Sequence, residues 1–347
     1  MPETWTLGVL CDLADGELRE LIRDLDLRIL APRTQRPEAV AETVRAAELL
    51  VCGIGPMLPA GRDIAEAPRL AFGQKLGSGV NGYDLAAFDS AGVPFSNMPG
   101  ATAPAIAEWC LGAALALSRR LLVVDAAIRS GGWPHQQLRS MGAQELRSQR
   151  IGVVGMGAIG QDCARLFRAI GCTVGYSNRT RRPALEESLG LEYLTLDELC
   201  RQSDVLVVAL ALNAETEGLL NGRRLRLLPQ GSYLVNATRG RILDEQVLIE
   251  LLAEGHLAGA ALDVFHTEPL PADSALRQLP NVLLFPHSSA DSPQTRQRLF
   301  RLANDNLRRA VAETDVHWVV NRAPAAVRRR TAGARELDAT LVHEVRL

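Results

Sequence analysis

The feature that most constrains the fold of this chain is a glycine-rich turn between a short apolar run and an amphipathic segment. The turn reads Gly155-Met156-Gly157-Ala158-Ile159-Gly160; the apolar run covers 151–154 and the amphipathic segment covers 159–170. In a strand–turn–helix unit, the first glycine permits a tight turn, the second lets the backbone approach a pyrophosphate, and the third allows close helix–strand contact. The helix N-terminus adds unpaired N–H groups and the positive end of the helix dipole. We therefore predict a dinucleotide-binding α/β domain, with a purely structural turn as the alternative, and cofactor contacts from Gly155, Gly157, Ala158, Ile159 and Gly160.

The rest of the chain alternates short apolar runs with helix-compatible stretches, which is typical of βαβ units around a parallel sheet. A first series of predicted strands covers 6–10, 27–30, 49–52, 70–76 and 93–96. A second series covers 151–154, 173–177, 205–210, 232–236, 259–263 and 282–285, enough for one doubly wound sheet. Because the 347 residues exceed the usual limit of about 250–300 for a single core, two domains are expected.

Two helical stretches set the expected domain boundaries. One long helix is predicted from 103 to about 130, where the sequence Ser-Gly-Gly-Trp-Pro ends it. A second helix is predicted over 294–311 and would return to the first domain, making that domain discontinuous. We expect one domain from 1–98 plus 290–322, a dinucleotide-binding domain from 99–289, and a tail at 323–347. The tail is rich in alanine and arginine and lacks a clear core pattern.

Composition excludes several classes of protein. The chain has 38 basic and 40 acidic residues and a net charge of −2, so no nucleic-acid partner is expected. No apolar run reaches the roughly 18 residues that span a bilayer, and the N-terminus lacks the basic and apolar regions of a signal peptide, so we expect a cytoplasmic protein without a membrane partner. The six cysteines form no CxxC pair and the histidines no cluster, which favours buried reduced thiols over disulfides and predicts no metal site.

The residues after the second strand of the glycine-turn domain indicate which nicotinamide cofactor is used. NAD-binding chains carry Asp or Glu about 20 residues past the first glycine, where it holds the ribose 2′-hydroxyl. Here the strand 173–177 runs into a segment with three arginines and no carboxylate, and a guanidinium group can bind a 2′-phosphate through paired hydrogen bonds. We expect NADPH to be preferred over NADH, with a solvated basic loop as the alternative. The predicted contacts are Ser177, Asn178, Arg179, Thr180 and Arg182.

Three chemically capable residues follow predicted strands. Arg239, Glu268 and His287 come just after 232–236, 259–263 and 282–285, and ligands of open α/β sheets bind at the carboxyl ends of strands. Reduction of a 2-oxo acid needs a cation for the carboxylate, an acid for the nascent alkoxide, and a partner for that acid; arginine, histidine and glutamate suit these tasks. Each residue has an ordinary alternative as a structural or surface group, and His266 is the rival histidine.

Together these segments resemble the D-isomer-specific 2-hydroxyacid dehydrogenase family, in particular its NADP-preferring glyoxylate/hydroxypyruvate reductase-like members. The matching runs are "GVVGMGAIG", "LVNATRGRILDEQVLIELLAEGHLAGAALDVFHTEPLP" and "NVLLFPH", preceded by "GSGVNGYDL" and "VPFSNMPGATAPAIAE". The similarity extends from about residue 45 to Asn321. It implies two Rossmann-like α/β domains with doubly wound parallel sheets and a cleft between them. The discontinuous domain would bind the substrate, and helices near 103–129 would join a homodimer.

The resemblance also implies roles for single residues. Arg239, Glu268 and His287 would be the catalytic three, and the loop with Ser78 and Gly79 would offer N–H groups to the substrate carboxylate. Further cofactor contacts would come from Thr102, Ala211, Thr216, Ala237, Thr238 and Asp263, the last of these approaching the nicotinamide carboxamide.

The sequence departs from the family pattern in a few places. Ala211 stands where many members have proline. Ser288 and Ser289 follow His287 where apolar or glycine residues are frequent, so Ser288 is expected to join Arg239 and His287 in binding the substrate. The run Arg328-Arg329-Arg330 in the tail is either solvated or reaches over a cleft to meet an anionic substrate.

Three functions remain open at this level. The leading one is an NADPH-dependent reductase of a small 2-oxo acid that forms the D-2-hydroxy acid. An alternative within the same fold is oxidation of phosphite, or reduction of a phosphonate-bearing 2-oxo acid such as phosphonopyruvate. A third is a dinucleotide-sensing, corepressor-like binding protein, because a fold alone does not establish chemistry.

Overall fold

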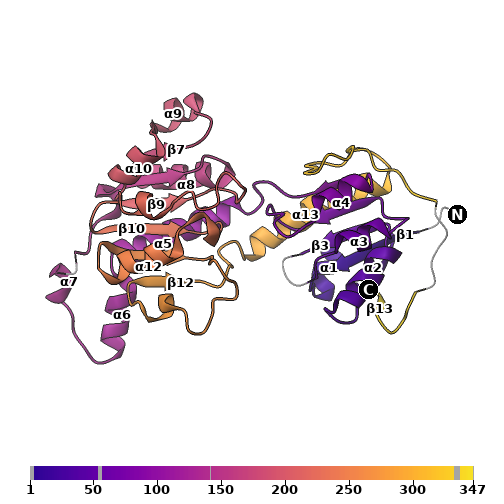
Figure 1. The fold of residues 1–347 in the computed structure, drawn as a ribbon, viewed down its shortest axis with the longest axis horizontal. Coiled ribbons are helices and arrows are strands. Elements are labelled where there is room, and N and C mark those ends of the chain that lie inside the picture. The colour runs from indigo at the N-terminus through magenta and orange to yellow at the C-terminus, as the bar shows by residue number, and fades with distance from the viewer. Residues whose placement is uncertain (1–3, 54–56, 141, 332–336, 347) are drawn as a thin grey trace. The chain divides into compact units, whose positions relative to one another are not determined.

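The computed structural model describes residues 4–53, 57–140, 142–331 and 337–346 of the chain. The chain forms two compact units, which are unit 1 (Met1–Ala101 with Ser292–Leu347) and unit 2 (Thr102–Asp291). Each unit has its own predominantly parallel sheet with helices against it (Figure 1). The expected α/β fold with two Rossmann-like parallel sheets is therefore confirmed.

The sheet of unit 1 has the strand order β13-β2-β1-β3-β4-β5, and its neighbouring strands are parallel except for the antiparallel pair β13–β2. Along β1, Leu7 and Val9 pack with α1 and α13, whereas Leu10 packs with α2, α3 and α4. Side chains of a strand alternate between its two faces, so helices cover both faces as a doubly wound sheet requires. The elements are β1 (Trp5–Leu10), α1 (Asp15–Leu21), β2 (Leu27–Pro32), α2 (Pro37–Ala46), β3 (Leu49–Cys52), α3 (Gly61–Ala65), β4 (Phe72–Lys75), α4 (Leu85–Ser90), β5 (Phe95–Ser96), α13 (Pro293–Val311) and β13 (Val342–Val345).

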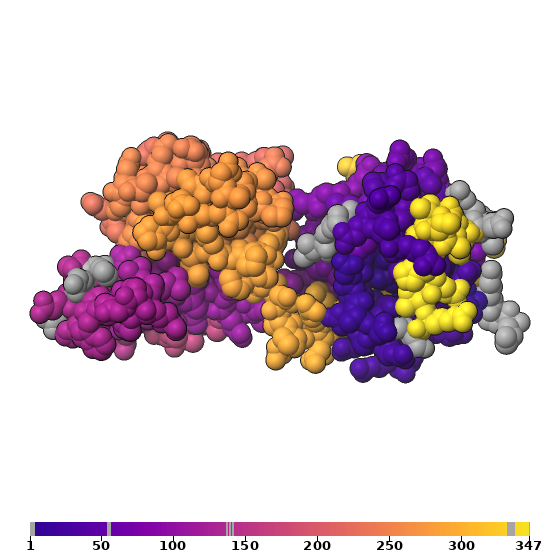
Figure 2. Space-filling view, turned by 90° about the horizontal axis from the view of Figure 1, so that it is seen from below, coloured from indigo at the N-terminus to yellow at the C-terminus, as the bar shows by residue number. Residues whose placement is uncertain are grey.

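The C-terminal residues belong to unit 1, although their sequence shows no core pattern. Strand β13 extends the sheet at the edge of β2, with Val345 opposite Ile29, and Figure 2 shows the yellow C-terminal residues against the indigo N-terminal ones. Val327 is fully buried in the same core. Strand β13 reads Val-His-Glu-Val, with two polar residues in its middle, so no apolar run in the sequence marks it as a strand.

Two members of the arginine run in this segment, Arg329 and Arg330, are held by acceptors within unit 1, which corrects both sequence-based alternatives for them. Arg329 Nε donates to Glu48 Oε1 at 2.8 Å, and its guanidinium lies 4.8 Å from the centre of the Trp5 ring. Arg330 Nη2 donates to Ala91 O at 2.6 Å. The correction has a physical reason: the Glu48 side chain is fully buried and accepts from Arg69 as well, so its charge needs cationic partners from outside its own strand.

The sheet of unit 2 has the order β12-β11-β10-β9-β6-β7-β8, and all its strand pairs are parallel. The chain order reverses where β6 and β9 lie side by side, which makes this the switch point where such sheets bind ligands. The two-residue strand β8 was not predicted. The elements are α5 (Ala103–Ser118), α6 (Leu121–Arg129), α7 (Gln137–Ser140), β6 (Arg150–Val154), α8 (Ala158–Ala169), β7 (Thr173–Ser177), α9 (Pro183–Leu189), β8 (Glu192–Tyr193), α10 (Leu196–Gln202), β9 (Val205–Val208), α11 (Gly222–Leu225), β10 (Ser232–Asn236), α12 (Glu245–Ala253), β11 (Leu257–Leu262) and β12 (Val282–Leu284).

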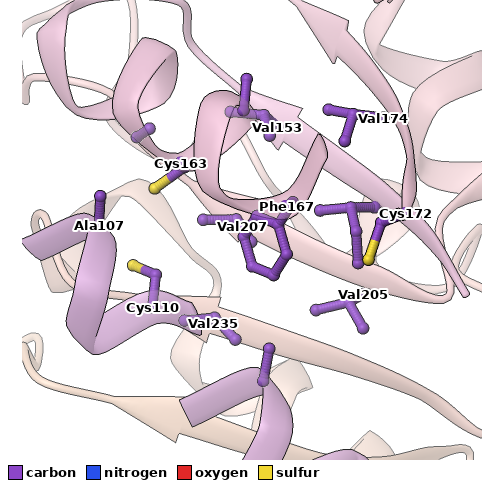
Figure 3. Packing of buried hydrophobic residues seen from close by; sticks show 14 of the residues in the cluster. Ala107, Cys110, Val153, Cys163, Phe167, Cys172, Val174, Val205, Val207 and Val235 are labelled. Carbon is purple, nitrogen blue, oxygen red and sulfur yellow. The ribbon is translucent and has the colours of Figure 1, made fainter. Parts of the chain in front are cut away.

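The core of unit 2 packs α8, the helix that begins in the glycine turn, against the sheet. Helices α5 and α8 pack on one face of the sheet, where Phe167 of α8 lies among valines of the strands (Figure 3). Cys110 of α5 and Cys163 of α8 are fully buried between them. The hydrogen bond with Cys163 and burial raise the pKa of the Cys110 thiol well above its ordinary value, so this thiol stays protonated. Five of the six cysteines are buried, as their apolar context predicted.

The predicted continuous helix from 103 to about 130 is wrong, because the structure divides it into α5 and α6. Arg120, between them, takes a left-handed conformation with φ of 55°. Its Nη1 donates to Ala258 O at 2.7 Å, and its guanidinium lies 5.5 Å from the Tyr233 ring centre. These contacts with distant strands, which no local pattern reveals, accompany the break. In the described parts of the chain, no helix is long and apolar enough to cross a membrane.

Candidate active site

The glycine turn joins β6 to α8 at the switch point of the unit 2 sheet. Gly155 has φ of 100°, and a Cβ added there would lie 2.6 Å from Ala209 O. A Cβ on Gly160 would lie 2.0 Å from Gly155 O, so both positions require glycine. Around Gly157, the N-cap of α8, an added Cβ would meet no atom within 4 Å. The turn therefore combines tight packing below with open space above the helix N-terminus, which fits a bound pyrophosphate.

The segment after β7 forms hydrogen bonds both within itself and to the glycine turn. Asn178 Oδ1 accepts from Met156 N of the glycine turn at 3.2 Å, while its Nδ2 donates to Thr180 O at 2.7 Å. Tyr176 OH accepts from Arg182 N at 2.7 Å. The loop is thus tied to the glycine turn by its own hydrogen bonds.

The arginines of this segment are not equivalent. Arg179 Nη1 contacts Glu215 Oε2 at 2.9 Å, and the two side chains are 83% and 72% exposed. Arg181 contacts Glu186 at 2.7 Å, and this hydrogen bond raises the pKa of Arg181. Glu215 lies beside Thr216, whose Oγ1 donates to Ala211 O at 2.7 Å. Sequence reasoning missed Glu215, which lies in a loop 36 residues from Arg179.

Arg239, Glu268 and His287 follow β10, β11 and β12, three strands that are neighbours in the sheet. His287 Nδ1 and Glu268 Oε2 are 2.6 Å apart. Glu268 Oε1 accepts from Phe265 N at 3.0 Å, and Arg239 Nη1 donates to Thr238 O at 2.6 Å. The rival His266 instead has its Nε2 on Leu243 O at 2.7 Å, so it is held by the backbone.

Burial and the neighbouring charges together shift the pKa values of Glu268 and Arg239. Burial raises the pKa of Glu268, but hydrogen bonds from His287 and from Phe265 N, together with the charges of His287 and Arg239, bring it below its ordinary value. Burial lowers the pKa of Arg239, and the Glu268 charge opposes that effect. Since arginine begins from a very high pKa, both groups are ionised at neutral pH. The site therefore holds a cation and a carboxylate-bound imidazole at one edge of the sheet.

The backbone of His287 is held by Asp263, a residue that sequence reasoning placed only near the cofactor. Asp263 is 1% exposed, and its main-chain O accepts from His287 N at 2.8 Å. Its carboxylate oxygens accept from Ser288 N at 2.8 Å and from Ser289 N at 3.1 Å. His287 has φ of 54°, a left-handed conformation that is unfavourable for a non-glycine residue, so the Asp263 contacts hold the loop against that preference.

The remaining predicted residues lie in both units. Ser78 and Gly79 lie in unit 1, after β4, where Ser78 O accepts from Asn97 Nδ2 at 2.7 Å. Lys75, at the end of β4, is only 4% exposed and its Nζ donates to Leu76 O at 2.8 Å. Sequence reasoning missed this buried lysine, although a lysine at the end of an apolar strand is a usable signal. Thr102, Ala237 and Thr238 lie in unit 2 with Arg239 and Ser288.

The described residues contain no group of three or more His, Cys, Asp or Glu side chains placed to hold a metal ion.

A glycine cradle at a sheet switch point, with an ionised arginine and a carboxylate-bound histidine at neighbouring strand ends, defines the class of nicotinamide-dependent oxidoreductases. Residues 111–289 match the family model "D-isomer specific 2-hydroxyacid dehydrogenase, NAD binding domain". The chain belongs to the D-isomer-specific 2-hydroxyacid dehydrogenase family, NAD(P)-dependent oxidoreductases that act on the CH–OH group of their donors.

Relatives and solved structures agree with this assignment. The chain is 36% identical over 250 residues to the glyoxylate reductase of Aeropyrum pernix, covering 70% of this chain and 74% of that protein. It is 34% identical over 275 residues to the glyoxylate reductase of Thermococcus onnurineus, covering 78% and 81%. A putative D-isomer specific 2-hydroxyacid dehydrogenase from Polaromonas sp. JS6 66 superposes with a TM-score of 0.81 at 29% identity, covering 92% of this chain and 100% of that one. The reaction therefore interconverts a 2-oxo acid and a 2-hydroxy acid with a nicotinamide dinucleotide.

Proposed function

We propose that the protein is an NADPH-preferring reductase that converts a small 2-oxo acid into the D-2-hydroxy acid. The overall change is 2-oxo acid plus NADPH plus H⁺ to 2-hydroxy acid plus NADP⁺. The observation that supports this most is the 2.6 Å contact between His287 Nδ1 and Glu268, which leaves His287 Nε2 for a substrate. Glyoxylate and hydroxypyruvate are the first candidates, the former because relatives such as the protein of Aeropyrum pernix are named glyoxylate reductase.

Each of the three side chains has one task. Arg239 binds the substrate carboxylate and polarises the 2-oxo group through paired hydrogen bonds. His287 donates its Nε2 proton to the oxygen that becomes the hydroxyl group. Glu268 accepts the Nδ1 hydrogen bond and so orients the ring toward the substrate. Bound NADPH supplies the hydride to C2. We retain Ser78, Gly79 and Ser288 as further substrate contacts.

The cofactor preference is supported by charge. The segment from Ser177 to Arg182 contains three arginines and no carboxylate, so nothing in it repels a 2′-phosphate. The Arg179 side chain is 83% exposed and that of its partner Glu215 is 72% exposed, so a phosphate can reach the guanidinium. We keep as proposed cofactor contacts the glycine turn together with Ser177, Asn178, Arg179, Thr180, Arg182, Thr102, Ala211, Thr216, Ala237, Thr238 and Asp263.

The test is NADPH oxidation with glyoxylate, hydroxypyruvate and phosphonopyruvate, followed by chiral analysis of the product from hydroxypyruvate. We expect D-glycerate, and a higher kcat/KM for NADPH than for NADH. Absence of turnover with every 2-oxo acid would overturn the proposal. Reduction of NADP⁺ by phosphite without turnover of the 2-oxo acids would assign the alternative reaction instead.

A further inference from the structure

A cavity of unit 1 collects three arginines, and none of its lining residues belongs to the candidate active site. It has a volume of about 410 Å³ and is lined by Glu20, Arg23, Arg298, Arg301 and the amide side chains at 294, 297 and 304. Its walls are α1 with the residues just after it, and one face of α13. Figure 2 shows gold residues of α13 beside the indigo N-terminal residues. Small-molecule sites have volumes of about 300–1,000 Å³, so the cavity is large enough for an organic ligand.

The two walls are fixed to each other on both sides of the cavity. At one side, Arg296 Nη1 contacts Glu17 Oε1 at 2.6 Å. At the other, Asn304 Nδ2 donates to Leu21 O at 2.9 Å, and Arg308 Nη2 contacts Asp24 Oδ2 at 2.9 Å. A cavity held open by contacts at both sides is formed before any ligand arrives, which reduces the cost of binding.

The positive charge inside the cavity is not neutralised by the protein. In the described part of the chain, Arg23, Arg298 and Arg301 form no ion pair, although Glu20 lines the same space. Arg298 uses Nε on Ala101 O at 3.0 Å and Nη2 on Thr295 Oγ1 at 2.9 Å, and both acceptors are neutral. Arg301 is exposed and has no hydrogen-bond partner among the described residues. With three arginines and only one glutamate, the cavity carries a net positive charge, and the arginines repel one another. A positively charged cavity attracts anions.

We propose that this cavity binds a small phosphorylated compound, with the phosphate on Arg23, Arg298 and Arg301. Guanidinium groups match the oxygen geometry of phosphate, and several of them together select a group that carries two charges over a single carboxylate. Glu20 and the amides of Gln294 and Gln297 suit the hydroxyl groups of a sugar-like organic part. This inference does not depend on the proposed reaction, because none of the residues that line the cavity is among the proposed substrate or cofactor contacts.

Isothermal titration calorimetry tests the proposal on the full chain, with NADPH at saturation so that the glycine turn is occupied. The probes are inorganic pyrophosphate and glucose 6-phosphate, with glucose and citrate as comparisons. We expect one saturable site for a phosphorylated probe and none for glucose. Arg301→Gln should weaken that site at least about tenfold, as expected for a lost charge-assisted hydrogen bond.

Arg309→Gln is the matched control, since it removes the same charge from the same helix at a residue that pairs with the exposed Asp305. It should leave phosphate binding unchanged, and neither variant should change the KM for the 2-oxo acid. Absence of saturable binding of both phosphorylated probes, binding of citrate alone, or equal loss in both variants would overturn the assignment. Because the readout is heat of binding, its failure is distinct from a failure to reduce 2-oxo acids.

Discussion

Glu268 and His287 show how two side chains distant in sequence form one hydrogen-bonded pair. The two residues are 19 positions apart, and their contact of 2.6 Å exists because β11 and β12 are neighbours in the sheet. Glu268 remains ionised because hydrogen bonds and nearby cations outweigh the effect of burial and hold its pKa below the ordinary value. A carboxylate in this state keeps the imidazole in one orientation at neutral pH.

His287→Asn should therefore lower kcat for 2-oxo acid reduction by about 10²–10⁴-fold, since a positioned general acid contributes about that much. Binding of NADPH, measured by fluorescence titration, should stay within about twofold of the parent because the histidine lies outside the glycine turn. His266→Asn is the control, and its kcat should be nearly unchanged because His266 is bound to the backbone at Leu243. A larger loss in the His266 variant would reverse the assignment of the two histidines.

Arg179→Gln should raise KM for NADPH by about 10–100-fold, the effect of a lost charge-assisted hydrogen bond of about 1.5–3 kcal/mol, and leave KM for NADH unchanged. Arg181→Gln should change the NADPH value much less because Arg181 is engaged by Glu186. Steady-state kinetics with both cofactors distinguishes these outcomes. An equal rise for NADH and NADPH would remove the basis for the NADPH preference.

Glu215→Gln should act in the opposite direction. Glu215 Oε2 lies 2.9 Å from Arg179 Nη1, so a 2′-phosphate has to compete with this carboxylate for the guanidinium group. Exposed ion pairs are worth about 0.2–1 kcal/mol, so the variant should bind NADPH up to about fivefold more tightly and NADH equally well. The control is Glu217→Gln, in the same loop as Glu215. It breaks a contact with Arg241 and should leave the affinities for NADPH and NADH unchanged. Weaker NADPH binding in the Glu215 variant would indicate that the glutamate supports the cofactor directly.

At the scale of elements, a helix, strand or turn can be predicted from the sequence when the contacts that define it involve residues close to it in the chain. The glycine turn and its flanking strand and helix were predictable because two requirements arise within the turn itself: Gly155 has a positive φ, and Gly160 lies close to Gly155 O. The positions of Arg239, Glu268 and His287 followed from strand ends. The break at Arg120 was not predictable because it involves Ala258 and Tyr233, which are distant in sequence.

The buried ion group around Glu48 could not be predicted for the same reason. Glu48 lies just before β3, and Arg329 comes from the C-terminal segment. Burial raises the pKa of Glu48, but hydrogen bonds from Arg329 and Thr6 N, with the charges of Arg69 and Arg329, lower it below the ordinary value. A charge pattern within either segment gives no sign that the two will meet.

Glu48→Gln should lower the free energy of unfolding by about 3 kcal/mol at pH 7, because it leaves the partly buried Arg69 and Arg329 without a counter-charge. The folded-state pKa of Glu48 is depressed, so this stabilisation is fully present above the unfolded pKa of about 4.3 and is lost as pH falls through the folded pKa. In denaturant unfolding, the difference between parent and variant should therefore begin to shrink as pH falls below about 4.3 and should disappear only below the folded-state pKa. Glu344→Gln, which removes an exposed pair with Arg28, should cost less than about 1 kcal/mol at either pH.

At the scale of the whole molecule, α6 is an apolar helix that its own unit leaves unburied. None of its residues is buried, and Leu121 and Ile128, which are seven positions apart and share one helix face, are 54% and 46% exposed. Apolar side chains grouped on an exposed helix favour association. We propose a homodimer through the helices near 103–129, in which this face is covered.

Leu121→Glu and Ile128→Glu should each convert the dimer to a monomer, because a charge would be buried without a partner at the interface. Light scattering after size-exclusion chromatography measures the mass directly. Leu58→Glu, at a 37% exposed position in unit 1, introduces the same change and should keep the dimer. A parent protein of monomer mass would contradict the proposal before any variant is made.

The pairing of β13 with β2 has a consequence for the order in which the chain folds during synthesis. Unit 2 is one continuous segment, Thr102–Asp291, so all its strands are translated before α13. Unit 1 has to wait, because α13 covers β1 and because β13 ends only at Val345. The first strands to be translated are thus among the last to be completed. Since exposed apolar surface and unpaired strand edges promote aggregation, the N-terminal segment is the part of a nascent or truncated chain most in need of chaperone protection.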